Sequence, residues 1–568
     1  MIWLVENLAP IMFVGLVALL LTGFPVAFAL AATGMVFGWI GVELGLVQAQ
    51  FFNALPLRLY GIMANDLLLA IPFFTLMGLI LERSRMAEDL LETIGQVFGP
   101  MRGGLAIAVV LVGALLAATT GVVAASVIAM GLISLPIMMR YGYNQSLAAG
   151  VITASGTLAQ IIPPSLVLIV IAEQFGQSVG DMYKAAFIPA FALVAIYGIV
   201  IMVIALVRPK WVPALPLEAR VYRESTGSSG YASLTVLTAA SAVVAALVAG
   251  NYGAIKLALG ADPAFTPAIE EIVVVTLMAA IVFAFIAAVC DSKFGLNLLS
   301  RLARQVTFVL IPPLLLVFLV LGTIFLGVAT PTEGGAMGAT GALVLAVARG
   351  RLSWSLLKQA LDSSARLSIF VMMILIGSTL FSLTFTAING NDWVRSLLSA
   401  LPGGEMGFVI FVSILVFFLG LFLEFFEIAF ILLPLLLPVA QDLGVNLVYL
   451  GVLIGMVLQT SFLTPPVGFS LFYLRSVSSK DDYTDKLTGR RIKGMSTGTI
   501  YRGAMAFVIL QCVMVGIMIW QPQIVLYGLS EQKVLDLENV NMDIAPMEFG
   551  DESLPGAEAE KPPTMPPE

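Results

Sequence analysis

Apolar runs long enough to cross a bilayer recur along most of this chain. A transmembrane helix needs about 20 predominantly apolar residues, because the hydrocarbon core is about 30 Å thick. Of the 568 residues, 60% are hydrophobic and only 11% are charged, whereas a typical soluble domain has about 25% charged residues. We therefore predict an all-α polytopic, multi-pass membrane protein, with spans near 4–22, 25–43, 66–82, 184–207, 232–250, 272–290, 305–327, 331–348, 366–386 and 500–521.

Two less regular blocks lie between these spans, at 103–176 and 406–476. Each carries adjacent prolines inside an apolar run, in "SGTLAQIIPPSLVL" (155–168) and "TSFLTPPVGFSLF" (460–472). Proline removes a backbone donor and clashes with the preceding turn, and hydrocarbon offers no water to the freed carbonyls. A helix broken at such a place exposes carbonyls that can bind a cation and N–H groups that can bind an anion. We predict two functional breaks rather than two proline kinks.

The two blocks share a spacing pattern that indicates an internal repeat. A proline, a glycine and an asparagine stand 27, 21 and 19 residues before Pro163, and the same three residue types stand at the same offsets before Pro465. The matched positions are Pro136, Gly142 and Asn144 in the first block and Pro438, Gly444 and Asn446 in the second. "FPVAFALAATG" and "TPTEGGAMGATG" also open corresponding spans. We predict two diverged halves, 1–208 and 305–521.

Positive charge predicts how the halves are oriented, because cytoplasmic loops carry excess Lys and Arg. With every basic cluster in the cytoplasm, 103–140 is a re-entrant hairpin from the cytoplasm and 406–441 is one from outside. Broken helices follow at about 144–176 and 446–476. The halves then have inverted topology, as in secondary transporters.

Segments outside the two halves carry further expectations. We expect a linker with two extra transmembrane helices at 209–304, interfacial helices near 50–63 and 351–364, and a polar, basic loop at 478–495. An acidic, disordered, external tail is expected at 522–568; its residues 531–568 carry a net charge of −8.

Residue types that are rare or absent exclude several functions. The chain has no histidine and only two cysteines, Cys290 and Cys512. A zinc site or a Ser/His pair is therefore excluded, and we expect no cofactor and no enzymatic activity. Both cysteines lie in apolar runs, where we expect buried side chains without a disulfide. An ion channel stays a remote alternative, because no span shows a stripe of polar residues.

Four motifs resemble the large membrane subunit of the tripartite ATP-independent periplasmic (TRAP) transporters: "TASGTLAQIIPPS", "GVATPTEGGA", "IPFFTLMGLILERS" and "TPPVGFSLF". The resemblance covers about 1–208 and 305–521. It implies an elevator-type, sodium-driven symporter of the ion-transporter superfamily, in a bacterial inner (cytoplasmic) membrane. It also implies a small membrane subunit, a periplasmic binding protein and an organic-acid (carboxylate) substrate, with no nucleic acid. A standalone sodium- or proton-coupled carboxylate carrier of the same superfamily is the alternative.

The resemblance also implies site residues, between the two hairpin tips and the two broken helices. In the first tip, "TTGVVAAS" (119–126), Thr120 and Gly121 keep the family pattern, whereas Val122 and Val123 replace hydroxyls. The implied substrate- and ion-binding residues are Thr120, Gly121, Ser155, Gly156, Thr157, Pro163, Thr460, Ser461, Thr464, Pro465, Gly468 and Glu424. One Na⁺ is expected near Ser155, Gly156 and Thr157, and another near Thr460, Ser461 and Thr464, on backbone carbonyls and hydroxyls.

Three glutamates have roles that the sequence leaves partly open. Glu424 and Glu427 lie in "LEFFEI" (423–428), where the second hairpin should turn. Carboxylates at such depth are functional by default, but a tip that reaches water is the alternative. For Glu333 in "TPTEGG" we favour a structural role as a helix cap.

Overall fold

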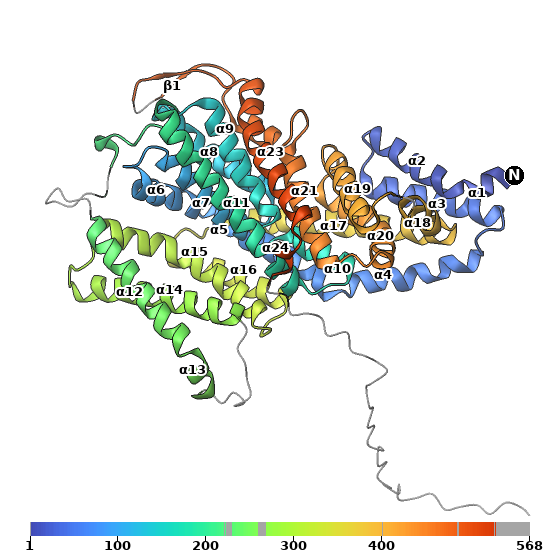
Figure 1. Cartoon of the computed structure of the whole chain (residues 1–568), viewed down its shortest axis with the longest axis horizontal. Helices are drawn as coiled ribbons and strands as arrows, with labels where there is room; N and C mark the ends of the chain where they lie inside the picture. Colours follow the sequence, from blue (N-terminus) through green and yellow to red (C-terminus); the bar gives the residue numbers. More distant parts are fainter. Residues whose placement is uncertain are drawn as a thin grey trace, which may run out of the picture. The chain divides into compact units, whose positions relative to one another are not determined.

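The computed structural model describes residues 2–220, 222, 230–258, 269–399, 401–485, 488–527 and 529. Within these residues, nine helices are long and apolar enough to cross a membrane, or up to eleven if two bent pairs each count as one span. The all-α prediction is confirmed, apart from one two-stranded antiparallel sheet, β1 (Tyr483–Thr484) with β2 (Arg491–Ile492), inside the expected loop 478–495. The whole described arrangement is drawn in Figure 1.

The helices up to residue 207 follow the predicted spans closely. They are α1 (Ile2–Glu6), α2 (Leu8–Leu21), α3 (Val26–Glu43), η1 (Ala49–Ala54), α4 (Leu55–Met63), η2 (Asp66–Leu69), α5 (Ala70–Arg83), α6 (Met86–Phe98), α7 (Gly104–Thr120), α8 (Val123–Arg140), α9 (Gln145–Thr157), η3 (Leu158–Gln160), α10 (Leu166–Phe175) and α11 (Val179–Val207). The segment expected near 50–63 forms η1 and α4, and the chain then bends by 46° into η2 and α5.

Later helices complete the fold. They are η4 (Pro209–Trp211), η5 (Leu217–Ala219), α12 (Tyr231–Gly250), α13 (Tyr252–Ala258), α14 (Ile269–Phe294), α15 (Arg301–Phe325), α16 (Pro331–Ala348), α17 (Trp354–Ala387), α18 (Gly390–Ser399), α19 (Gly404–Leu419), α20 (Phe425–Asp442), α21 (Leu447–Leu463), α22 (Phe469–Val477), α23 (Thr497–Trp520) and α24 (Gln523–Leu526). The separate interfacial helix expected at 351–364 is wrong. That stretch is the start of α17, a single helix of 34 residues capped by Ser353, because no proline or glycine interrupts it before Gly377.

Close backbone contacts sort the long helices into two groups. A Cβ on Gly34 of α3 would lie 2.7 Å from the Leu380 carbonyl of α17, and one on Gly377 of α17 would lie 2.3 Å from the Ala27 carbonyl of α3. In the other group, Gly150 of α9 and Gly503 of α23 bring those two helices equally close: a Cβ on Gly150 would lie 2.3 Å from the Gly503 carbonyl. Glycine at these crossings therefore lets the helices of each pair pack with their backbones close together.

The two hairpins, α7–α8 and α19–α20, end in ion pairs of opposite sense. Arg140, the last residue of α8, lies 3.2 Å from Asp485, and Asp442, the last residue of α20, lies 2.7 Å from Arg395. Arg140 and Asp442 stand at the same offset, 23 residues before Pro163 and Pro465. The equivalent helix ends therefore carry residues of opposite charge, each paired with a partner, and the membrane orientation of the two halves stays a prediction.

The linker between the halves contains the two long helices that the sequence predicts, α12 and α14, together with the short α13. Helices α12 and α14 pack beside α15 (Figure 1), where Asp291 near the end of α14 pairs with Arg304 at 2.7 Å. Both cysteines are free, but the expected burial is wrong: Cys290 is half-buried and Cys512 is exposed. An apolar run in a membrane protein also supplies lipid-facing surface, so apolarity does not fix burial.

The expected tail begins later than residue 522. Residues Gln523–Leu526 form α24, and the Val525 side chain is fully buried. The acidic segment 530–568 lies outside the described residues.

Candidate functional site

The first predicted break is observed between α9 and α10. After the 3-10 turn η3, residues 161–165 are not helical, and every one of them is buried. Ser165 ties the break together: its Oγ donates to the Gln160 carbonyl at 2.8 Å and accepts from the Val167 N–H at 3.2 Å, which caps α10. The Pro163–Pro164 peptide bond is cis. One serine thus bonds to the chain on both sides of the break.

The second predicted break is observed between α21 and α22, at residues 464–468. Here the link is Ser470, whose Oγ donates to the Phe462 carbonyl at 2.8 Å. Pro466 is exposed, and the Pro465–Pro466 bond is also cis.

The residues preceding the two breaks have matching conformations. Gly142 and Gly444 have φ of +80° and +72°, and Asn144 and Asn446 cap α9 and α21 with bonds of 3.1 and 3.0 Å. The offsets read from the sequence therefore mark equivalent structural positions.

The predicted cation-binding hydroxyls lie inside the broken helices and donate to carbonyls of their own helix. The acceptors are Val151 for Ser155, Ala154 for Thr157, Met456 for Thr460, Leu458 for Ser461 and Thr460 for Thr464, at 2.6 to 2.9 Å. Each hydroxyl oxygen keeps lone pairs that can accept or coordinate. In each half a serine of the broken helix packs against a hairpin glycine: Ser155 against Gly113 and Ser461 against Gly420.

Thr120 and Gly121 end the first helix of the first hairpin. The Thr120 hydroxyl donates to the Leu116 carbonyl at 2.9 Å and lies 2.7 Å from the Ser126 hydroxyl across the tip. Gly121 has φ of +60°, and a Cβ there would lie 3.1 Å from the Leu166 side chain, so the tip packs directly on the start of α10.

A cavity of about 230 Å³, which we name the tip pocket, lies where both hairpin tips meet both broken helices. Two of the predicted site residues, Gly121 and Glu424, line it. The other lining residues are Val122, Val123, Ala124, Gln160, Leu166, Val167, Leu367, Phe425, Phe426, Phe462 and Tyr473. The remaining predicted residues, Thr120, Ser155, Gly156, Thr157, Pro163, Thr460, Ser461, Thr464, Pro465 and Gly468, do not line it.

Three helix N-termini converge on the tip pocket. The lining residues Val123, Leu166 and Phe425 are the first residues of α8, α10 and α20. Each N-terminus carries a partial positive charge of about half a unit, together with N–H groups that lack a helical acceptor. No lysine or arginine is among the lining residues, and the only carboxylate is Glu424. Any positive potential here therefore comes from the backbone rather than from a cationic side chain, and at α20 the capping box of Glu424 and Glu427 offsets it.

Gln160 and Tyr473 are pocket residues that the sequence reasoning missed. Gln160 is 1% exposed, and its Oε1 has no hydrogen-bond partner within the described part of the chain. An unpaired buried acceptor costs free energy unless a ligand satisfies it. The signal for Gln160 was available, since it is the amide side chain three residues before the Pro-Pro pair. No such sequence signal was available for Tyr473, because its neighbours in the pocket come from distant segments.

The glutamates divide between structure and site. Glu333 forms a capping box with Thr330, whose N–H donates to Glu333 at 2.8 Å, so the predicted cap is confirmed. Glu427 likewise accepts from the Glu424 N–H at 2.9 Å and closes the start of α20. Glu424, half-buried at that helix start, is the one that faces the pocket. No cluster of three or more Asp, Glu or Cys side chains able to hold a metal ion occurs among the residues that the structure describes.

Comparison with known proteins identifies the family. Residues 13–524 match the model of "Tripartite ATP-independent periplasmic transporter, DctM component". The C4-dicarboxylate TRAP transporter large permease protein DctM of Pseudomonas aeruginosa is 27% identical over 84% of this chain and 90% of its own length. The protein of the same name from Rhodobacter capsulatus is 28% identical over 83% of this chain and 90% of its own length.

A solved structure of the YdaH transporter of Alcanivorax borkumensis aligns with a TM-score of 0.48 and 12% identity, covering 82% of this chain and 87% of that one. The relatives are named as transporter permeases, which agrees with the expectation that the chain is not an enzyme. Because the family model spans nearly the whole described chain, this protein is a multi-pass membrane permease that belongs to the DctM component family of the tripartite ATP-independent periplasmic transporters.

Proposed function

We propose that this chain is the permease subunit of a sodium-coupled symporter, in a bacterial inner membrane, for an organic acid that a periplasmic binding protein delivers. The observation that carries the proposal is the tip pocket, where three helix N-termini meet around a cavity with no cationic side chain in its lining. Helix N-termini are ready-made sites for carboxylates. A small membrane subunit completes the proposed complex, as the family's tripartite description implies.

The need for a cation follows from the same electrostatics. A substrate carboxylate entering the tip pocket meets the Glu424 carboxylate, and like charges in a site of low dielectric repel strongly. Sodium held by break carbonyls and by hydroxyls such as Ser155 and Thr460 would offset that repulsion. Cation binding then raises substrate affinity, which is the thermodynamic basis of coupling.

The proposed elevator motion divides the chain along its packing groups. The moving body holds both hairpins and both broken helices. We assign α23 to this moving body rather than to the scaffold, because Gly150 and Gly503 hold α9 and α23 in close backbone contact. The scaffold contains α3, α5, α15, α16 and α17.

Uptake into proteoliposomes tests the proposal. The purified chain is reconstituted with its small subunit and binding protein, and uptake of radiolabelled succinate and gluconate is followed. We expect uptake only with an inward sodium gradient. Equal uptake with a proton gradient alone would refute sodium coupling, and undiminished uptake without the binding protein would favour the standalone carrier.

A further inference from the structure

A second polar cavity lies away from the tip pocket, between the α4–η2 arm and helices α10, α17 and α20. It has a volume of about 220 Å³, and we name it the Arg58 pocket. Its lining residues are Arg58, Ile62, Asn65, Leu68, Glu173, Gln174, Leu375, Ser378, Thr379, Ser382 and Pro434. The volume is below the roughly 300–1,000 Å³ of sites for drug-sized ligands, so the cavity suits a small one.

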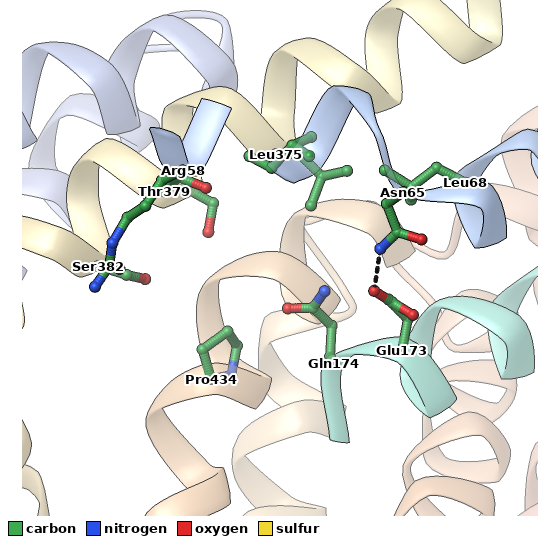
Figure 2. Close-up of a pocket in the computed structure, with 11 residues that line it drawn as sticks. Arg58, Asn65, Leu68, Glu173, Gln174, Leu375, Thr379, Ser382 and Pro434 are labelled. Carbon is green, nitrogen blue, oxygen red and sulfur yellow. Dashed lines mark hydrogen bonds between the residues drawn. The ribbon is translucent and has the colours of Figure 1, made fainter. Parts of the chain in front are cut away.

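Opposite charges stand on opposite sides of this cavity. In Figure 2, Arg58 reaches in from α4 beside Ser382, while Glu173 points in from the end of α10 on the far side. No ion pair joins the two charges in the described structure, and Arg58 is exposed, without a hydrogen-bond partner there. The guanidinium is therefore free to bind a carboxylate in a bidentate way.

Glu173 is held in place rather than free. Asn65 Nδ2 donates to Glu173 Oε1 (Figure 2), and Asn65 Oδ1 accepts from the Leu67 N–H at 2.9 Å. Both ends of the amide are thus engaged, which fixes its orientation. The second carboxylate oxygen of Glu173 is left to accept hydrogen bonds from a ligand.

Hydroxyls and an amide occupy the space between the charges. Ser378 is already engaged, because its hydroxyl donates to the Phe430 carbonyl. Thr379 and Ser382 of α17 and Gln174 of α10 line the cavity, and their side chains have no hydrogen bond to any described residue. Side chains at such spacing on α17 share one face of the helix.

We propose that the Arg58 pocket binds a small hydroxylated monocarboxylate, with its carboxylate on Arg58 and its hydroxyls donating to Glu173. Because the Glu173 carboxylate is negatively charged and only accepts hydrogen bonds, a dicarboxylate that spans the pocket meets like-charge repulsion at its second end. The site therefore selects hydroxyl donors over a second carboxylate. The inference rests on the proposed function, since it describes a place where the organic acid binds apart from the tip pocket.

The site's place in the fold supports a role before translocation. Under the predicted topology, α4, the end of α10 and the end of α17 face the periplasm. The pocket also joins the arm and α17 to α10 and α20, which the proposed mechanism assigns to the moving body. A ligand bound there contacts both bodies.

Calorimetric titration of the purified full chain in nanodiscs tests the proposal, with gluconate and succinate as probes. We expect gluconate to bind more tightly than succinate, and Arg58→Gln to weaken gluconate binding roughly tenfold or more. Glu173→Gln should weaken gluconate and strengthen succinate, reversing the selectivity. Arg102→Gln is the matched control, because Arg102 is an exposed arginine outside both pockets, and it should bind both probes as the wild type does.

Two outcomes would overturn the Arg58 site. One is gluconate binding unchanged in Arg58→Gln but altered in Glu424→Gln, which would place the ligand in the tip pocket. The other is unchanged selectivity in Glu173→Gln. Neither bears on sodium coupling, which the uptake assay decides separately.

Discussion

The two helix breaks share a motif but differ in how they are held. At the first, residues 161–165 are all buried, and Ser165 bonds to the chain on both sides of the gap. At the second, Pro466 is exposed, its carbonyl accepts from the Tyr501 hydroxyl of α23 at 2.7 Å, and Gly468 precedes α22 without a side-chain cap. The first break is therefore the more tightly held of the two, and under the proposed function we expect it to be the more rigid cation site.

Removing the prolines should give the largest difference in sodium affinity between the two breaks. Replacing Pro163 and Pro164 with alanine lets a helix run through, which closes the carbonyls that the break leaves open. We expect the apparent sodium affinity of uptake to fall roughly tenfold or more, about 1.4 kcal/mol. The same exchange at Pro465 and Pro466 should cost less, because that break is less buried. Sodium titration of uptake measures both.

Expression and membrane insertion of both double variants serve as the control. Wild-type sodium affinity in the first variant would mean that the break is only a kink. A larger effect at the second break would reverse the comparison.

Glycine contacts of the two broken helices give a second contrast. A Cβ on Gly156 would lie 2.3 Å from the Val127 side chain and 3.1 Å from its backbone, whereas one on Gly455 meets its nearest atom at 3.5 Å. We expect Gly156→Ala to destabilise the protein by about 1–3 kcal/mol through overpacking. Gly455→Ala should be neutral, or stabilising by up to about 1 kcal/mol. Thermal unfolding in detergent distinguishes them, and equal midpoints would contradict the account.

The serines that span the breaks predict a smaller difference. Ser165→Ala removes a helix cap and a bridge across the gap, at a cost of about 1–2 kcal/mol. Ser470→Ala removes a single bond to the Phe462 carbonyl, at about 1 kcal/mol. The thermal midpoint should fall further for Ser165→Ala, and the reverse order would show that the second break is the more tightly tied.

The hairpin ends predict the smallest effect. Hydrogen bonds from Thr488 and the guanidinium of Arg140 hold the pKa of Asp485 below its ordinary value. A lowered pKa stabilises the docked loop at every pH above the ordinary value of about 3.9, and that stabilisation is lost as the pH falls through the folded pKa. Docking should therefore be constant from about pH 5 to pH 8.

Asp485→Asn should raise trypsin cleavage of loop 478–495 in inverted vesicles a few-fold at pH 7. Asp442→Asn, the equivalent change at the other hairpin, should leave this loop unaffected. A loop that becomes more protected in Asp485→Asn would contradict the docking role.

How far the sequence predicts this structure depends on the range of the interactions. Prolines and repeated offsets are local, so they placed both breaks, and the cap at Thr330 and Glu333 was likewise predicted from neighbouring residues. The tip pocket is not local: Gln160 and Tyr473 become neighbours only because α10 and α22 pack around the same tips. The predicted burial of Cys512 was wrong for a similar reason, because an apolar run has the same composition whether it faces protein or lipid.

Thiol labelling at the tip pocket tests the central claim most directly. Ala124→Cys, in a chain with Cys290 and Cys512 replaced by alanine, places one thiol in the lining. Its rate of reaction with a small maleimide is measured with sodium, with each organic acid, and with both together. The account predicts protection only when sodium and a transported acid are both present. A labelling rate that neither sodium nor the acid changes would contradict the account. Full protection by the acid in the absence of sodium would contradict it as well.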